Sequence, residues 1–258
     1  MTHEEEIISS VKRDYIENLA SQNKRADARS MDQYREISVE PGWARNAEGS
    51  ALVKLGNTQV LAGVKLERGT PYPDKPESGV LITTAELVPV AHPTFEPGPP
   101  GEETVELARV VDRGIRESET IDLDKMVIEP GEEVWLVYVD IYVLDHDGNL
   151  IDASALASIA ALWHMEIPED LEDWTLPELP VSKKPIATTV AKISDKIMVD
   201  PCFDEESVMD SRLTITTMEN GDICAMQKGG SGPLLVNDVR EAYELARTKS
   251  KELRKYIE

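Results

Sequence analysis

The sequence has few cysteines, few aromatic residues and few basic residues for its length. Two cysteines in 258 residues cannot build a disulfide framework, and they fit a reducing compartment. A CxxC pair or a Cys/His set with ligand spacing is absent from the sequence, so we expect no metal site of that kind. Aromatic residues make up 5% of the chain, which leaves the core to Val, Ile, Leu, Ala and Met. A chain of this length can bury a sizeable core.

The shortage of positive charge limits the partners. The chain has 27 basic and 49 acidic residues, a formal net charge of −22. Such a surface repels nucleic acid at long range, so any RNA contact has to come from a local basic cluster or from partner chains. The opening residues lack the basic and apolar regions of a signal peptide, and no apolar run approaches membrane-spanning length. We therefore expect a soluble cytoplasmic protein without membrane contact.

Hydrophobic periodicity predicts the elements of the first half. Apolar residues at helical spacing predict one helix over 4–20 and another over 102–118. Gly56-Asn57 is typical of a tight hairpin turn between two strands. Strand signals cover 36–40, 49–55, 58–66 and 81–90.

The second half begins after residues 165–185, which are rich in Pro, Glu and Asp. The turn Glu219-Asn220-Gly221 indicates a second hairpin. Strands are predicted near 186–199, 212–218 and 222–227, and a helix over about 236–257. Each half thus has a strand hairpin followed later by a helix, which predicts an α+β fold of two pseudo-duplicated halves.

Residues 134–163 predict a strand, a turn and an Ala-rich helix. A helix N-terminus at the end of a strand presents free backbone N–H groups and the positive end of the helix dipole, which favour an anion. The turn, however, contains Asp145 and Asp147, the helix contains Asp152, and we expect no Lys or Arg to offset these carboxylates. The architecture suggests an anion site, and the side chains argue that none operates.

Three arginines share one face of the predicted helix 102–118. Arg109, Arg113 and Arg116 lie at positions i, i+4 and i+7. Three guanidinium groups in one row suit bidentate contacts to phosphate. The alternative is a solvated face with intrahelical ion pairs, because Glu106 and Asp112 lie three or four positions away. By spacing alone, we favour the ion pairs.

Other candidate residues do not form a complete catalytic set. An acidic group at 204–210 has the composition of a metal or acid–base site, but a chain this acidic produces such groups by chance. Arg212 follows it and could simply neutralise it. The four histidines are scattered along the chain, and no Ser or Cys has the context of a nucleophile.

Several stretches together resemble the ribonuclease PH family of phosphorolytic exoribonucleases. They are Arg29-Ser-Met-Asp-Gln-Tyr-Arg35, Gly49-Ser-Ala-Leu-Val-Lys-Leu-Gly-Asn-Thr58, Arg109-Val-Val-Asp-Arg-Gly-Ile-Arg-Glu-Ser118, Trp135 to Ala161, and Val199 to Leu213. Their order and spacing make the resemblance specific, and it runs from about residue 27 to 258. Within this family, the sequence most resembles the non-catalytic ring subunit of the archaeal exosome.

Departures from the family pattern indicate a non-catalytic chain. Active members resemble Asp-Gly-Gly-Thr-Arg-Thr-Ala-Ser at the anion-binding turn, whereas this chain has Gly148, Asn149, Leu150 and Ile151 after Asp147. Leu150 and Ile151, at the Thr and Arg positions, cannot donate side-chain hydrogen bonds to phosphate. Arg212 stands where active members place an Asp, and the upstream acidic position is Glu206. A guanidinium cannot act as that carboxylate does.

The resemblance implies a fold like domain 2 of ribosomal protein S5, with two βαβα-like halves at about 27–165 and 186–258, preceded by an N-terminal helix and connector at 1–26. It implies a non-catalytic subunit that alternates with a catalytic homologue in a six-membered ring, beneath KH- and S1-type cap proteins. It also makes Arg109, Arg113 and Arg116 the expected contacts to single-stranded RNA, with no cofactor and no metal. The alternatives are an active phosphorolytic exoribonuclease and a scaffold without RNA contact.

Overall fold

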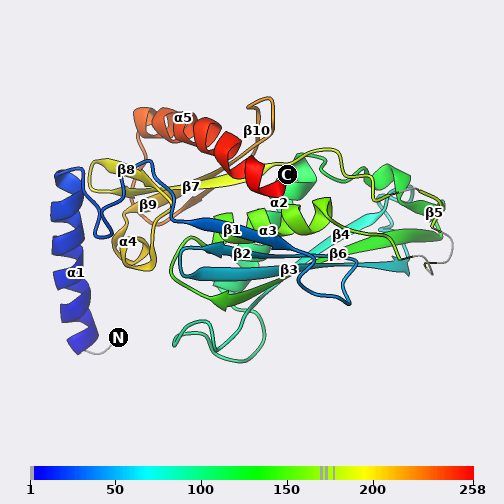
Figure 1. Ribbon diagram of the computed structural model, residues 1–258, viewed down its shortest axis with the longest axis horizontal. Coiled ribbons are helices and arrows are strands. Elements are labelled where there is room, and N and C mark those ends of the chain that lie inside the picture. The colour runs from blue at the N-terminus through cyan, green and yellow to red at the C-terminus, as the bar shows by residue number, and fades with distance from the viewer. Residues whose placement is uncertain (1–2, 169–170, 172–173, 177) are drawn as a thin grey trace.

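The computed structural model describes residues 3–168, 171, 174–176 and 178–258, with side chains from Lys12 onward. Its elements stack in four layers (Figure 1). A six-stranded sheet is covered by α2 (Glu102–Glu117) and α3 (Leu150–Trp163), then comes a four-stranded sheet, and α5 (Val236–Leu253) covers its outer face. The α+β fold class is therefore confirmed.

The larger sheet is antiparallel except for one pair. Its order is β1 (Ile37–Pro41), β2 (Gly49–Leu55), β3 (Thr58–Gly69), β6 (Glu133–Asp145) and β4 (Val80–Leu87), with β5 (Val127–Glu129) paired to β6. The predicted turn at Gly56-Asn57 is confirmed, since Leu55 lies opposite Thr58 and Gly56 has a positive φ of 58°. β4 and β6 are parallel, and α2 lies in the crossover between them.

The smaller sheet is antiparallel throughout, in the order β10 (Ile223–Gly229), β9 (Ser211–Thr217), β7 (Ile186–Ile193) and β8 (Lys196–Val199). The predicted turn at 219–221 is also confirmed, because the Met218 N–H donates to the Asp222 carbonyl across it. Helix α4 (Phe203–Val208) precedes β9, and α1 (His3–Ser21) contacts it at the edge of the molecule (Figure 1).

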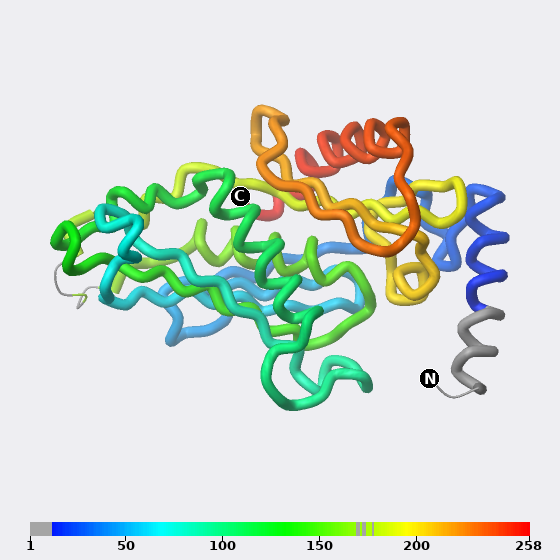
Figure 2. Tube along the Cα trace, turned by 180° about the vertical axis from the view of Figure 1, so that it is seen from behind, coloured from blue at the N-terminus to red at the C-terminus, as the bar shows by residue number. Residues whose placement is uncertain are grey.

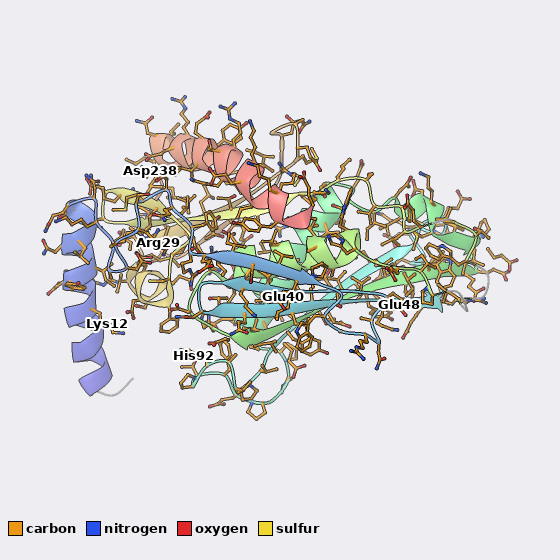
Figure 3. The ribbon with its side chains drawn as sticks, in the orientation of Figure 1. Lys12, Arg29, Glu40, Glu48, His92 and Asp238 are labelled. Atoms are coloured by element: carbon orange, nitrogen blue, oxygen red, sulfur yellow. The ribbon has the colours of Figure 1, made fainter. Side chains whose placement is uncertain are left out.

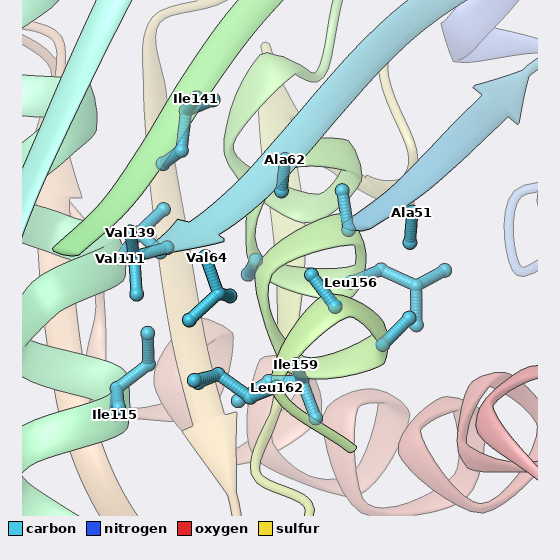
Figure 4. Close-up of a cluster of buried hydrophobic side chains, with 14 of the residues drawn as sticks. Ala51, Ala62, Val64, Val111, Ile115, Val139, Ile141, Leu156, Ile159 and Leu162 are labelled. Carbon is cyan, nitrogen blue, oxygen red and sulfur yellow. The ribbon is translucent and has the colours of Figure 1, made fainter. Parts of the chain in front are cut away.

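Helix α3 lies between the two sheets and forms the centre of the core. Twelve of its 14 residues are buried, because it packs on β2 and β3 on one side and on β7 on the other. Its many alanines allow both sheets to approach closely. Figure 4 shows this cluster, in which Leu156, Ile159 and Leu162 of α3 meet side chains of the larger sheet and of α2. The contributing residues include Val64, Val111, Ile115, Val139 and Ile141.

Element ends differ from the sequence prediction where local chemistry intervenes. The strand predicted over 81–90 ends at Leu87, shortly before Pro89, which cannot donate a ladder hydrogen bond. The last helix changes to a 3₁₀ turn at Arg254–Ile257, where the Arg254 guanidinium donates to the carbonyls of Lys184 and Thr217. In the part of the chain that the structure describes, no helix has the length and apolar character to cross a membrane.

Candidate functional site

The turn between β6 and α3 is fixed by close backbone packing. Gly148 has a φ of 86°, and a Cβ placed there would lie 2.5 Å from the Phe203 nitrogen and from the Cys202 carbonyl carbon. Only glycine accommodates both the conformation and the close approach. Asn149 follows in the left-handed region, and its side-chain amide donates to Asp152 and Asp200. The predicted strand–turn–helix is therefore present, with a rigid turn.

A carboxylate lies on the N-terminus of α3. Oε1 of Glu206, on α4, accepts the backbone N–H of Asn149 at 2.9 Å. Burial raises the pKa of Glu206 to about 7, although the Asn149 N–H and the charge of Arg212 act in the opposite direction. No local pattern in the sequence indicates this hydrogen bond, because the two residues are 57 positions apart.

The side chains at the predicted phosphate positions are apolar. Leu150 and Ile151 line a pocket of about 180 Å³ together with Glu206 and Arg212. Ile151 is buried in the main core, and Leu150 packs against it. The structure therefore brings these four residues, which the sequence analysis singled out from separate segments, to one pocket.

Arg212 points from the start of β9 toward α2. Its Nη2 donates to Oε2 of Glu106 at 2.9 Å. The other Glu106 oxygen accepts from Gln227, whose amide oxygen in turn accepts from Arg113 at 3.3 Å. A continuous chain of hydrogen bonds thus joins the pocket to the arginine row of α2.

The three arginines of α2 differ in their surroundings. Arg116 donates to both carboxylate oxygens of Asp112 and to the Leu81 carbonyl, the intrahelical pair that spacing alone favours. Arg113 is partly buried and donates to Gln227. Arg109 is exposed, and its side chain forms no hydrogen bond or ion pair with any residue that the structure describes. Figure 2 shows α2 on the back of the molecule, near β10.

An arginine from a distant segment reaches the turn, contrary to the sequence interpretation that no basic residue offsets it. Arg35 donates to the carbonyl oxygens of Asp147 and Gly148 and forms an ion pair with Asp200 at 2.7 Å. These carbonyls accept hydrogen bonds, so Arg35 faces the back of the turn. Burial alone would raise the pKa of Asp200, but the hydrogen bonds and charge of Arg35 hold it below its usual value.

Arg35 and Asp200 belong to a buried ionic cluster that contains two further arginines. The sequence analysis did not predict this cluster. Arg29 pairs with Asp200 at 2.8 Å, and Arg25 donates to both oxygens of Glu205 and to backbone carbonyls. Figure 3 labels Arg29 in the connector that follows α1, beside α4. The cluster therefore fastens the connector to the second half of the chain.

The remaining acids at 204–210 are paired one by one. Asp204 lies 2.7 Å from Lys12, and Asp210 lies 3.9 Å from Arg13. Across the described ranges, no three His, Cys, Asp or Glu side chains gather as a metal would require. Arg212 pairs with Glu106 of α2, so it does not neutralise this group as a whole.

Two histidines come together beside the turn, although their sequence positions are scattered. The rings of His92, Phe95, His146 and Phe203 lie with centroids 4.7–5.5 Å apart. Burial, with the charges of His92 and Arg35, lowers the pKa of His146 to about 4. This cluster holds the loop at 88–101, which projects from the body, against the turn (Figures 2 and 3).

Glu206→Gln is expected to flatten the pH dependence of the unfolding free energy. The folded-state pKa of about 7 lies above the ordinary 4.5, so between these values the folded chain retains a proton that the unfolded chain has lost. The resulting stabilisation is present near pH 5 and is lost as the pH rises through 7. Urea unfolding from pH 5 to 8 measures the difference. Glu103→Gln, at an exposed position of the same pocket, should retain the wild-type slope.

Comparison with known proteins agrees with this geometry. The family model for domain 1 of the 3′ exoribonuclease family matches residues 33–168, and the model for domain 2 matches residues 184–249. The chain belongs to this family, the ribonuclease PH family, as its motifs predict. Among relatives, "Exosome complex component Rrp42" of Pyrococcus furiosus is 52% identical over 98% of this chain and 95% of that protein. The protein of the same name from Methanocella arvoryzae is 51% identical over 98% of both.

Solved structures give the same result. A chain of the Archaeoglobus fulgidus exosome with RNA bound to the active site superposes with a TM-score of 0.94 and 49% identity, covering 98% of this chain and all of that one. A chain of an archaeal exosome core has a TM-score of 0.90 and 46% identity, covering 98% and 99%. Rice Rrp46, at 20% identity and a TM-score of 0.70, shares the fold.

Proposed function

We propose that this chain is a non-catalytic subunit of an exosome-type complex that degrades RNA by 3′-to-5′ phosphorolysis. The observation that carries the proposal is the pocket at the N-terminus of α3, where Leu150 and Ile151 offer no hydrogen-bond donor and Arg212 stands at the acid position. The extent of similarity to exosome components supports membership in such a complex.

The proposed partners follow from the family. The chain alternates with a catalytic homologue in a six-membered ring, completes the RNA-binding groove and structures the neighbouring active site, and KH- and S1-type proteins cap the ring. Arg109, Arg113 and Arg116 contact the phosphates of single-stranded RNA, and the complex works in the cytoplasm. The exposed Arg109, without a partner among the described residues, is the most available of the three.

The isolated chain is expected to release no nucleoside diphosphate from single-stranded RNA in phosphate buffer. Arg212→Asp should not create activity, because donors for phosphate would still be missing at Leu150 and Ile151. Chromatography of the nucleotide products is the measurement, with the catalytic homologue as positive control. Phosphate-dependent trimming by the pure chain, abolished by Glu206→Ala, would establish the enzyme alternative instead.

Mixing the chain with its catalytic homologue is expected to give a stable complex of defined mass. An obligate interface of this type buries more than about 2,000 Å². Alone, the chain should tend to self-associate despite its net charge of −22. Light scattering after size exclusion gives the mass. A stable monomer that ignores the homologue would contradict ring membership.

A further inference from the structure

The pocket at the N-terminus of α3 already contains an anion, and that anion belongs to the chain itself. Glu206 Oε1 accepts the Asn149 N–H at 2.9 Å, the position a bound oxyanion would take at a helix N-terminus. The other oxygen accepts no hydrogen bond from any described residue, although Arg212 lies close enough to lower the Glu206 pKa by its charge. A carboxylate beside a backbone amide and a guanidinium has the surroundings of a bound phosphate group.

Glu206 is held there by the element that presents it. Helix α4 begins at Phe203, and the adjacent Glu205 accepts the Cys202 N–H at 2.9 Å while it pairs with the buried Arg25. Glu205 and Arg25 are almost completely shielded from solvent. α4 is therefore fastened independently of Glu206, and its backbone leaves the Glu206 side chain facing the turn.

The groups around the pocket could receive an oxyanion if the Glu206 carboxyl group were absent. The Asn149 N–H would then be free, and the Arg212 side chain lines the same pocket. Inside the folded chain, Glu206 competes with any free anion as a tethered group, which gives it a large advantage. The pocket volume of about 180 Å³ admits a small anion.

We propose that Glu206 is a built-in occupant of the anion position at the N-terminus of α3, and that it closes this pocket to free oxyanions such as phosphate. The Glu206 carboxylate thus occupies the anion position, and the side chains of Leu150 and Ile151 provide no hydrogen-bond donor there. This concerns the single chain and holds whether or not the chain enters a ring. It predicts that a residue without a hydrogen-bond acceptor at this one position opens a phosphate-binding site that has no catalytic activity.

The test is phosphate binding by the full-length chain at pH 8, where the Glu206 carboxylate of the wild type is ionised. Isothermal titration with inorganic phosphate at constant ionic strength compares wild type, Glu206→Ala and Glu206→Met. Removal of the competing carboxylate should tighten phosphate binding by at least about tenfold in Glu206→Ala. Glu40→Gln removes the same charge at an exposed position outside the pocket and should bind as the wild type does. A parallel titration with a nucleoside monophosphate distinguishes free phosphate from phosphate carried by a nucleotide.

Equal phosphate affinity in wild type and in a folded Glu206→Ala variant would overturn the proposal, as would a matching gain in Glu40→Gln. Glu206→Met removes both oxygens at a similar side-chain length and keeps the test decisive if the alanine variant does not fold. The NMR signal of the Asn149 amide in the wild type gives a further test. This resonance should not shift when phosphate is added, whereas the same resonance should shift in Glu206→Met.

Discussion

Reversing the charge of Arg113 and Arg116 is expected to weaken RNA binding by the assembled ring, by about tenfold or more for each arginine–phosphate hydrogen bond that the variant removes. In the proposed ring, RNA would have to approach a chain of net charge −22 through a focused cationic surface, so these few guanidinium groups should matter disproportionately. The double variant Arg113→Glu/Arg116→Glu should still assemble, and the partner should still cleave very short RNA.

The measurement is RNA affinity of the ring as a function of salt. Each phosphate that is no longer neutralised should reduce the log–log slope by about 0.7–1. Arg240→Glu/Arg247→Glu, two exposed positions on α5, changes the net charge equally and should weaken binding much less. Equal curves for the α2 and α5 variants would mean that the α2 face is a solvated surface whose arginines only pair within the protein.

Asp200→Ala is expected to destabilise the isolated chain by about 3–5 kcal/mol, because it leaves buried positive charge without its partner. Asp200 is fully buried, and its two oxygens accept from Arg29, Arg35 and Asn149. Asp200 lies in the second half of the chain and accepts hydrogen bonds from the segment after α1 and from the turn before α3. The variant therefore removes a carboxylate that joins these three parts.

Urea unfolding at low protein concentration measures this destabilisation. Glu40→Ala is the matched control, since Glu40 forms an exposed ion pair with Lys54 at 3.0 Å and such pairs contribute about 0–1 kcal/mol. A change at Asp200 no larger than the change at Glu40 would show that the cluster contributes little to stability.

The local elements could be predicted from the sequence because their signals are local. Alternating apolar residues, with the turns Gly56-Asn57 and Asn220-Gly221, predict β2, β3, β9 and β10, and the apolar row of 102–118 predicts α2. The side-chain partners in the site could not be predicted in this way. Arg35 reaches Asp147 across 112 positions and Glu206 reaches Asn149 across 57, and neither segment has a composition that marks its partner.

The arginine row illustrates the same limit. Spacing predicts correctly that Arg109, Arg113 and Arg116 share a face, and it predicts the pair between Arg116 and Asp112. It cannot reveal that Gln227, from a strand of the other sheet, holds Arg113. Which guanidinium groups remain available is a property of the tertiary packing.

Gly148 packs closely on the backbone at 201–203. Under the proposed function, this packing limits which sequence changes could have removed catalytic activity without disrupting the fold. The turn joins the end of β6 to the segment before α4, so its main chain is needed for folding whether or not it binds anything. Mutational drift would then be free to replace the donors at the positions of Leu150 and Ile151 but not to remodel the loop that carries them. Under the proposed function, the backbone of this turn would be retained because folding requires it, whether or not it binds substrate.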